Sequence, residues 1–183
     1  MIWTAIVPLK LRAQRKSRLA PCLSPQERQT LSDRMAARVL AALDEAGIPA
    51  RVLSPVPWAD AVWEPDHGAG LNAELDRVRV ALACAPLLVI SGDLPLLTAA
   101  DVHMLLAGAE AQGVAIAPDR HGRGTNAIAL CDSRPFAFAF GEGSFARHLA
   151  AAQGAATIRD RPGLAIDLDT PADLDEAGRL GWA

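Results

Sequence analysis

Two kinds of hydrophobic pattern alternate along the chain. Short continuous apolar runs are typical of strands that a parallel sheet buries on both faces. Longer segments between them repeat apolar residues at helical spacing, as Leu31, Met35, Val39 and Leu43 do at every fourth position. The alternation predicts strands separated by amphipathic helices. The apolar runs predicted as strands lie at 2–7, 50–53, 86–90, 114–117, 127–130 and 164–166.

Capping residues mark where the helices begin. Ser24, with Pro25 at the first helical position and Glu27 after it, forms a capping box, and the same spacing of a Thr and an acid recurs at 98–101 and 170–173. We therefore predict helices from Pro25 to Gly47, over 71–84, from Thr98 to near Gly113, over 144–153, and from Pro171 onward. Residues 54–70 are rich in Pro, Gly and acid and predict a loop, with room for a short strand around Val62.

Strands that alternate with helices predict an α/β fold, here a single-domain three-layer sandwich with a mainly parallel sheet. The 183 residues suit one domain over 1–183. No repeat, low-complexity tract or linker divides them. In such sheets ligands bind at the carboxyl ends of the strands, so candidate chemistry is expected there.

Composition and charge exclude several kinds of partner. The chain has 18 Lys and Arg against 21 Asp and Glu, a net charge of −3, and 4% aromatic residues with no Tyr. This balance argues against a nucleic-acid binder, and the lack of a long apolar stretch argues against a membrane protein. The 3 Cys and 4 His show no CxxC, HxH or HExxH spacing. We therefore expect reduced thiols, no zinc site and a cytoplasmic protein.

One short segment is basic in this net-acidic chain. Lys10, Arg12, Arg15, Lys16 and Arg18 directly follow the first predicted strand, where a phosphate-binding loop would lie. Cations at that place neutralise a triphosphate and stabilise the charge that builds in the transition state. No GxxxxGK[ST] or GxGxxG motif accompanies them. The segment is either a phosphate-binding loop of another kind or a solvated basic loop.

Acidic residues follow two of the predicted strands. Asp93 comes after the run 86–90. Asp167 and Asp169 follow the run 164–166 and, being two residues apart, face the same way on an extended chain. Carboxylates at strand ends suit a hard cation such as Mg2+, which bridges them to substrate phosphates. Capping of the turn or helix that follows is the alternative, although it leaves Asp167 unexplained.

Two glycine-rich turns carry hydroxyl or amide side chains, Gly-Arg-Gly-Thr-Asn at 122–126 and Gly-Glu-Gly-Ser-Phe at 141–145. The second turn precedes a predicted helix, whose N-terminus and backbone N–H groups could hold an anion. Each turn is a weak signal by itself, because Gly, Thr and Asn are common in turns.

Short motifs run along the chain in an order that identifies a family. They are Val-Pro-Leu-Lys at 7–10, Lys-Ser-Arg-Leu at 16–19, Leu-Ser-Pro-Gln-Glu-Arg at 23–28, Gly-Leu-Asn at 70–72, Ser-Gly-Asp-Leu-Pro at 91–95, Gly-Thr-Asn-Ala at 124–127, Phe-Gly-Glu-Gly-Ser-Phe at 140–145 and Asp-Leu-Asp-Thr-Pro at 167–171. The set resembles the guanylyltransferases of coenzyme F-420 biosynthesis, which act on 2-phospho-L-lactate or phosphoenolpyruvate. It covers nearly the whole chain.

The resemblance implies the nucleotidyltransferase (nucleotide-diphospho-sugar transferase-like) variant of the Rossmann-type fold and a site with three parts. GTP would bind to Pro8, Leu9, Lys10, Lys16, Arg18 and Asn72. Mg2+ would be held by Asp93 and by one or both of Asp167 and Asp169. The phospho-acid acceptor would bind to Thr125, Asn126, Gly141, Gly143 and Ser144. The catalytic residues would be Lys10, Lys16 and Asp93.

The implied reaction moves GMP from GTP onto the phosphate of the acceptor. That phosphate oxygen is already ionised at neutral pH, attacks the α-phosphorus in line, and pyrophosphate leaves. Catalysis then consists of positioning and charge neutralisation, which needs no His or Cys constellation. The implied partners are GTP, a small phosphorylated carboxylic acid and the downstream transferase that consumes the product, with the protein a monomer or homodimer.

Three alternatives remain. The acceptor could be 3-phosphoglycerate, and Glu142 adds a negative charge beside the acceptor residues where the family has Pro. A molybdopterin-type cytidylyltransferase is disfavoured, because the basic loop lacks the Gly-x-x-x-Arg pattern of that group. A non-catalytic nucleotide-binding domain is disfavoured, because both acidic sites, Asp93 and Asp167/Asp169, are present.

Overall fold

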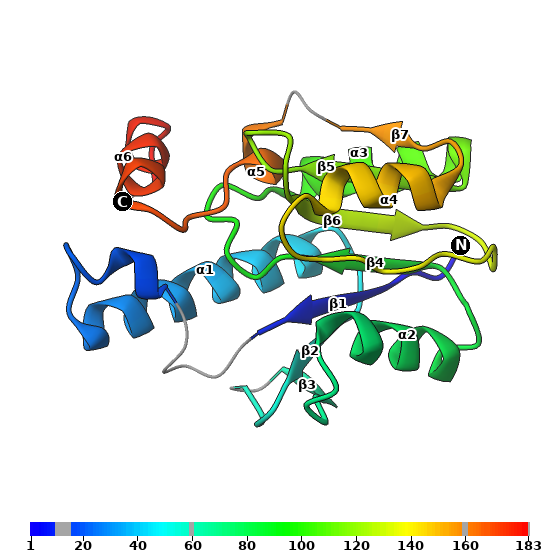
Figure 1. Ribbon diagram of the computed structural model, residues 1–183, viewed down its shortest axis with the longest axis horizontal. Helices are drawn as coiled ribbons and strands as arrows, with labels where there is room; N and C mark the ends of the chain where they lie inside the picture. The colour runs from blue at the N-terminus through cyan, green and yellow to red at the C-terminus, as the bar shows by residue number, and fades with distance from the viewer. Residues whose placement is uncertain (10–15, 59–60, 159–160, 183) are drawn as a thin grey trace.

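A sheet forms the middle layer of the molecule, and helices cover both of its faces (Figure 1). The computed structural model describes residues 1–9, 16–58, 61–158 and 161–182. Within these residues, seven strands pair in the order β3-β2-β1-β4-β6-β5-β7. The strands are β1 Thr4–Pro8, β2 Ala50–Ser54, β3 Val62–Pro65, β4 Leu87–Ile90, β5 Val114–Pro118, β6 Thr125–Leu130 and β7 Ala156–Thr157.

Strand β6 runs opposite to its neighbours. It pairs antiparallel with β4 and with β5, whereas the pairs β1–β2, β1–β4, β2–β3 and β5–β7 are parallel. The sheet is therefore mainly parallel, which confirms the predicted α/β class. The short β3 occupies the place around Val62 where the sequence left room for a strand.

Helices pack on both faces of the sheet. On one face, α1 and α3 bury residues such as Val39 and Leu105, and on the other, α2 and α4 bury Leu75 and Phe145. Burying one such side chain contributes roughly 1.5–3 kcal/mol. No helix in the described part of the chain combines the length and apolarity that crossing a membrane requires. The helices are α1 Pro25–Glu45, α2 Leu71–Ala81, α3 Ala99–Gln112, α4 Ser144–Ala152, α5 Pro162–Ala165 and α6 Pro171–Arg179, with a 3-10 turn, η2, at Ser17–Leu19.

Local capping chemistry sets three of the helix starts. The capping boxes predicted at 24–27, 98–101 and 170–173 are all present, each with both reciprocal hydrogen bonds. Each box satisfies backbone N–H groups that a helix start otherwise leaves unpaired. The starts of α1, α3 and α6 are therefore encoded within four residues of sequence.

One predicted strand is wrong. The run 164–166 belongs to helix α5 and the residue after it, and Pro162 at the first helical position favours that start. Leu164 is buried in the core all the same. An apolar triplet satisfies burial as a helix or as a strand, so the hydrophobic pattern does not separate the two. The edge of the sheet is formed instead by β7, paired with β5.

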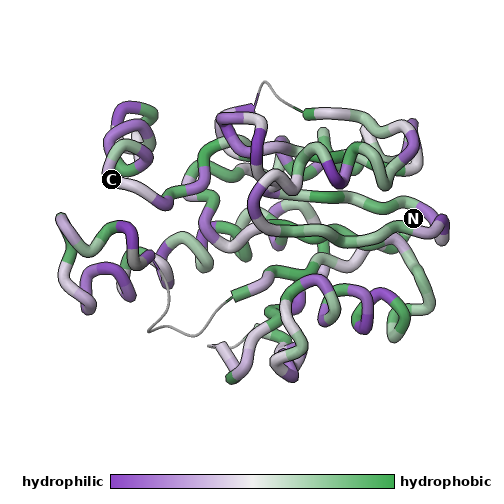
Figure 2. The backbone as a smooth tube through the Cα atoms, viewed as in Figure 1, coloured by the Kyte–Doolittle hydropathy of each residue, from purple (hydrophilic) through white to green (hydrophobic). Residues whose placement is uncertain are grey.

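The central strands are mainly apolar, and Figure 2 shows hydrophobic residues gathered along them. Every residue of β4 and of β6 is buried. Because these two strands are antiparallel, the carboxyl end of β4 lies beside the start of β6, where the Ser91 amide donates to the Asn126 carbonyl at 2.8 Å. The segments after β1 and β4 and the start of β6 therefore share one edge of the sheet.

Candidate active site

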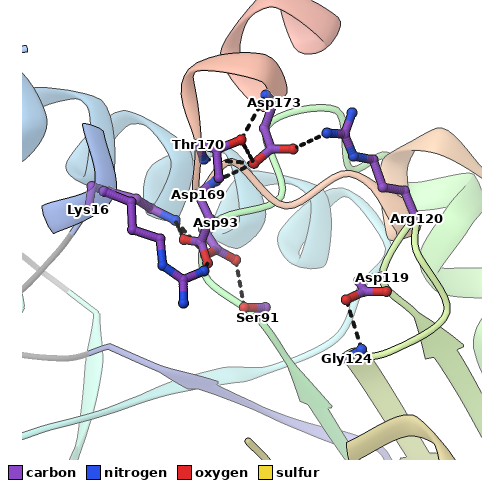
Figure 3. A network of polar contacts seen from close by, with 10 residues as sticks. Lys16, Ser91, Asp93, Asp119, Arg120, Gly124, Asp169, Thr170 and Asp173 are labelled. Carbon is purple, nitrogen blue, oxygen red and sulfur yellow. Dashed lines mark hydrogen bonds and ion pairs between the residues drawn. The ribbon is translucent and has the colours of Figure 1, made fainter. Parts of the chain in front are cut away.

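A lysine and two aspartates meet at this edge (Figure 3). Lys16 Nζ donates to Asp93 Oδ2 at 2.6 Å and to Asp169 Oδ1 at 2.8 Å. The Lys16 side chain is only 6% exposed, whereas those of Asp93 and Asp169 are 24% and 43% exposed. The ammonium is thus covered, and the carboxylates keep surface that a ligand can reach.

Backbone geometry and neighbouring hydrogen bonds fix each member of this cluster. Lys16 has a φ of 56°, in the left-handed region that residues other than glycine seldom adopt, and leads directly into η2. Ser91 Oγ donates to Asp93 Oδ1 at 2.6 Å. The Asp169 amide donates to Asp173 Oδ2 at 3.1 Å, next to the α6 capping box. The three charged groups are therefore held from three separate parts of the fold.

Opposite charges outweigh burial at Lys16 and Asp93. Burial alone would lower the pKa of the Lys16 ammonium, but Asp93 and Asp169 hold that pKa above its usual value. Burial would raise the pKa of Asp93, and the Lys16 charge and hydrogen bond reverse this, so the pKa of Asp93 is lowered. At Asp167, burial and the negative charges of Asp93 and Asp169 raise the pKa to about 7. A further cation would relieve this repulsion.

The donor set fits a hard divalent cation in its chemistry. Asp93, Asp167 and Asp169 offer only carboxylate oxygen, which Mg2+ prefers, and one lysine does not balance three acids. Among the described residues, no group of three His, Cys, Asp or Glu side chains already stands in a metal-binding arrangement. The Lys16 ammonium lies between Asp93 and Asp169 instead. A cation bound there would need Lys16 to turn to another anion, such as a substrate phosphate.

Thr125 and the turn 141–144 lie together on the other side of the site. Gly141 and Gly143 have φ values of 122° and 67°, which allow the chain to turn into α4. The Phe145 amide donates to the Arg123 carbonyl at 3.1 Å and ties the start of α4 to the residues just before β6. The structure thus brings together the two glycine-rich turns that the sequence suggested, and their binding of an acceptor stays a prediction.

Two asparagines of the predicted site bind backbone groups of this chain. Asn72 Oδ1 accepts from the Phe140 amide at 2.7 Å, and its Nδ2 donates to the Phe140 carbonyl at 3.3 Å. Asn126 Nδ2 donates to the carbonyls of Leu164 and Ala165 at 3.0 and 3.2 Å. Asn72 therefore anchors the residues before the 141–144 turn, and Asn126 anchors α5. Direct roles toward GTP or the acceptor stay predictions for both.

Part of the rest of the predicted GTP site lies outside the residues that the structure describes. Lys10, with Arg12 and Arg15, lies outside the described residues. Pro8 ends β1, and Leu9 is buried against Gly92, where any side chain would collide with it. Arg18 is 75% exposed and lies 4.0 Å from Asp169. The described residues therefore supply Lys16 as the covered cation of this segment and Arg18 as an exposed one.

Two residues near the start of α4, Arg147 and His148, shape the site through contacts that the sequence does not reveal. His148 is fully buried and contacts Thr125. Arg147 lies near the start of α4, where the helix dipole does not favour a cation, and its guanidinium donates to the carbonyls of Ala139 and Glu142. Helical spacing alone gives no signal for these contacts, since their partners lie in another element or an irregular segment.

Comparisons with known proteins identify the family and the fold. A family model described as "Guanylyl transferase CofC like" matches residues 3–178. The chain is 41% identical over 193 residues to the phosphoenolpyruvate guanylyltransferase of Sphaerobacter thermophilus, covering 96% of this chain and 92% of that protein. The corresponding protein of Chloroflexus aggregans is 38% identical over 182 residues, 89% of this chain and 90% of that one. The 2-C-methyl-D-erythritol 4-phosphate cytidylyltransferase of Thermus thermophilus has the same fold, with a TM-score of 0.57 at 19% identity over 98% of each chain.

Proposed function

We propose that this chain, which belongs to the CofC-like guanylyl transferase family, transfers the guanylyl group of GTP to the phosphate of phosphoenolpyruvate and releases pyrophosphate. Family membership makes it a guanylyltransferase with a nucleotidyltransferase fold. The choice of acceptor is supported by its relatives, which are named phosphoenolpyruvate guanylyltransferases. The product would be an enolpyruvyl-diphosphoguanosine, which suits the coenzyme F-420 pathway that the motifs imply.

The observation that carries the proposal is the contact of Lys16 with Asp93 and Asp169. A nucleotidyl transfer needs positive charge at the α-phosphate and a place for the charge of the triphosphate. This cluster supplies a covered ammonium and reachable carboxylates at the edge of the sheet where such folds bind ligands. No other described residue combines those properties with the family motifs Lys-Ser-Arg-Leu and Ser-Gly-Asp-Leu-Pro.

The residues of this chain divide the work of the reaction. Mg2+, held by Asp93 with Asp167 or Asp169, would supply positive charge to the triphosphate. Lys16 turns from the carboxylates to the α-phosphate and neutralises the charge that builds there. The acceptor phosphate is ionised at neutral pH, so an oxygen of that phosphate attacks the α-phosphorus without a general base. The new P–O bond forms as the bond to pyrophosphate breaks.

The second part of the site would hold the acceptor. Thr125 is 8% exposed and Ser144 is buried at the first turn of α4. A helix N-terminus favours an anion through its unpaired N–H groups and dipole. Phosphoenolpyruvate carries a carboxylate and a phosphate, so one of its anionic groups lies at this turn while the other faces GTP.

A pyrophosphate-release assay with Mg2+ tests the proposal. It crosses GTP, ATP and CTP with phosphoenolpyruvate, 2-phospho-L-lactate and 3-phosphoglycerate. We expect release only with GTP, and most rapidly with phosphoenolpyruvate. Faster release with either other acid would correct the acceptor and keep the reaction. Release with CTP, or GTP binding by calorimetry without any release, would contradict the proposal.

A further inference from the structure

His148 lies between Thr125 and an irregular segment that we call the strap, residues 132–143 between β6 and α4. The side chain is fully buried. Its Nδ1 lies 2.9 Å from Thr125 Oγ1, and its Nε2 accepts from the Ala139 amide at 2.9 Å. One imidazole thus connects a residue of the predicted acceptor site to the strap that leads into the 141–144 turn.

The Ala139 contact decides where the ring proton is. A backbone amide only donates, so Nε2 of His148 must be the unprotonated nitrogen. Burial, with the nearby charge of Arg147, lowers the pKa of His148 to about 4, so the ring is neutral at physiological pH. A neutral ring whose Nε2 is bare carries its proton on Nδ1. His148 therefore donates to Thr125 Oγ1, and the Thr125 hydroxyl proton points to a different acceptor.

Aromatic neighbours prevent the ring from turning over. The Phe140 ring packs edge-on against His148 with centroids 4.8 Å apart, and the Phe136 ring stacks on it at 5.8 Å. A flipped ring would also put Cε1–H in the place of Nε2 and Cδ2–H in the place of Nδ1, so the hydrogen bonds to Ala139 and Thr125 would both be lost. The orientation of the imidazole is therefore fixed before any ligand binds.

A bulge in β6 places Thr125 on the His148 side of the sheet. Ala117 pairs with Ala127, but Pro118 pairs with Thr125, so Asn126 is an extra residue in the ladder. Side chains alternate between the two faces of a regular strand, which would place Thr125 on the same face as Ala127. The extra residue reverses this, and bulges beside active sites commonly re-aim a side chain in this way. The observed Thr125–His148 contact requires that reversal.

We infer that His148 is a positioning residue, which uses its Nδ1–H to turn the Thr125 hydroxyl proton toward an anionic group of the phospho-acid acceptor. The inference rests on the proposed function, since it names an acceptor at Thr125. His148 itself does not touch the acceptor. It fixes the direction of a hydrogen bond that a freely rotating hydroxyl would make only part of the time.

Two substitutions each remove one of the two hydrogen bonds of the ring and keep the other. In His148→Gln, the side-chain amide reaches the place of Nε2 and keeps the Ala139 contact, while the donor to Thr125 is lost. In His148→Asn, the amide reaches the place of Nδ1 and keeps that donor, while the Ala139 contact is lost. We expect His148→Gln to raise the KM for phosphoenolpyruvate about tenfold or more, as loss of a hydrogen bond to a charged group does, with the KM for GTP unchanged. His148→Asn should recover most of the acceptor affinity.

The matched control is Arg79→Lys, which tests whether loosening the strap by itself changes the KM for the acceptor. Arg79 donates to the carbonyls of Asp132, Arg134 and Phe136 and does not contact His148 by a hydrogen bond. Its substitution should lower the melting temperature and leave the acceptor KM unchanged. An acceptor KM raised as much by Arg79→Lys as by His148→Gln would overturn the inference, because strap loosening would then explain both.

A double-mutant cycle with Thr125→Val gives the deciding result. If His148 acts through the Thr125 hydroxyl, His148→Gln changes the acceptor KM by less than about twofold once that hydroxyl is gone. Independent, multiplying effects would overturn the inference, as would an Nε2 proton in the long-range 1H–15N spectrum of the wild-type imidazole. Lack of transfer by the wild-type protein to any phospho-acid would overturn the proposed function together with the inference. Normal wild-type transfer with multiplying effects would overturn the inference alone, so the two failures can be told apart.

Discussion

The two sides of the site are held together in different ways. The cation side consists of Lys16, Asp93 and Asp169, and the acceptor side consists of Thr125 and His148. The first group is joined by ion pairs whose carboxylates remain partly exposed. The second is joined by hydrogen bonds around a neutral, fully buried imidazole and is packed by aromatic rings.

The difference suggests how each side meets its ligand. An ammonium that pairs with carboxylates can exchange them for a phosphate. The ion pairs of the cation side can therefore rearrange when a phosphate group binds. A neutral, packed network has one arrangement and leaves one direction free for a hydroxyl proton. Under the proposed function, the molecule would combine an exchangeable side for GTP with a preorganised side for the acceptor.

The largest expected effect is on the cation side. Asp93→Asn removes a charge that pairs with Lys16 and is a predicted metal ligand, while it keeps the shape of the side chain. We expect transfer to fall by roughly a thousandfold or more, as it does when a preorganised charge at the reacting centre is removed. Pyrophosphate release measures this, and circular dichroism with thermal melting checks the fold. A folded variant with near-normal turnover would refute the role of Asp93.

Lys16→Met tests whether the ammonium exchanges partners. We expect kcat/KM for GTP to fall about a hundredfold, since a cation at the α-phosphate is lost. Lys16→Arg keeps the charge with different geometry and serves as the control, with a smaller loss. If both variants bind GTP normally and transfer at the wild-type rate, Lys16 serves only to pair the two aspartates.

The acceptor side should show a specific dependence of stability on pH. The folded pKa of His148 is about 4, below the ordinary 6.5, so the unfolded chain takes up the proton first as pH falls. The contribution of His148 to the free energy of unfolding is therefore fully present above pH 6.5. About 2 kcal/mol of this contribution is lost by pH 4.5. Asp167 acts in the opposite direction, because its pKa of about 7 lies above the ordinary 3.8.

Urea unfolding at pH 7 and pH 4.5 separates these contributions when wild type is compared with His148→Gln. The variant should lack the His148 part of the pH dependence and keep that of Asp167. An identical pH dependence in the two proteins would mean that His148 titrates normally in the fold.

The smallest effect concerns the link between the two sides. Arg120, in the turn between β5 and β6, pairs with Asp173 Oδ1 at 2.6 Å, and Asp173 also accepts from the Asp169 amide. Arg120→Gln should lower the free energy of unfolding by about 1 kcal/mol, because the ion pair is only partly buried. Chemical denaturation measures it. A much larger loss, or a raised KM for both substrates, would show that the sides are not independent.

The sequence by itself determined the features whose causes are local. The boxes at Ser24, Thr98 and Thr170 depend on partners three residues away, so the starts of α1, α3 and α6 could be read directly. The apolar run over β4 and the acid that follows it likewise pointed to the edge of the sheet where Asp93 lies. Hydrogen bonds of this range need no partner from a distant part of the chain.

Only the tertiary structure decided the features whose causes lie far apart in the chain. Lys16 meets residues 77 and 153 positions away, and Asn126 binds carbonyls of an α5 that the hydrophobic pattern predicted as strand. The bulge that turns Thr125 toward His148 is a property of the ladder between β5 and β6. Sequence spacing supplies the residue types, but which side chains meet depends on packing, and packing decides which atom of His148 carries the proton.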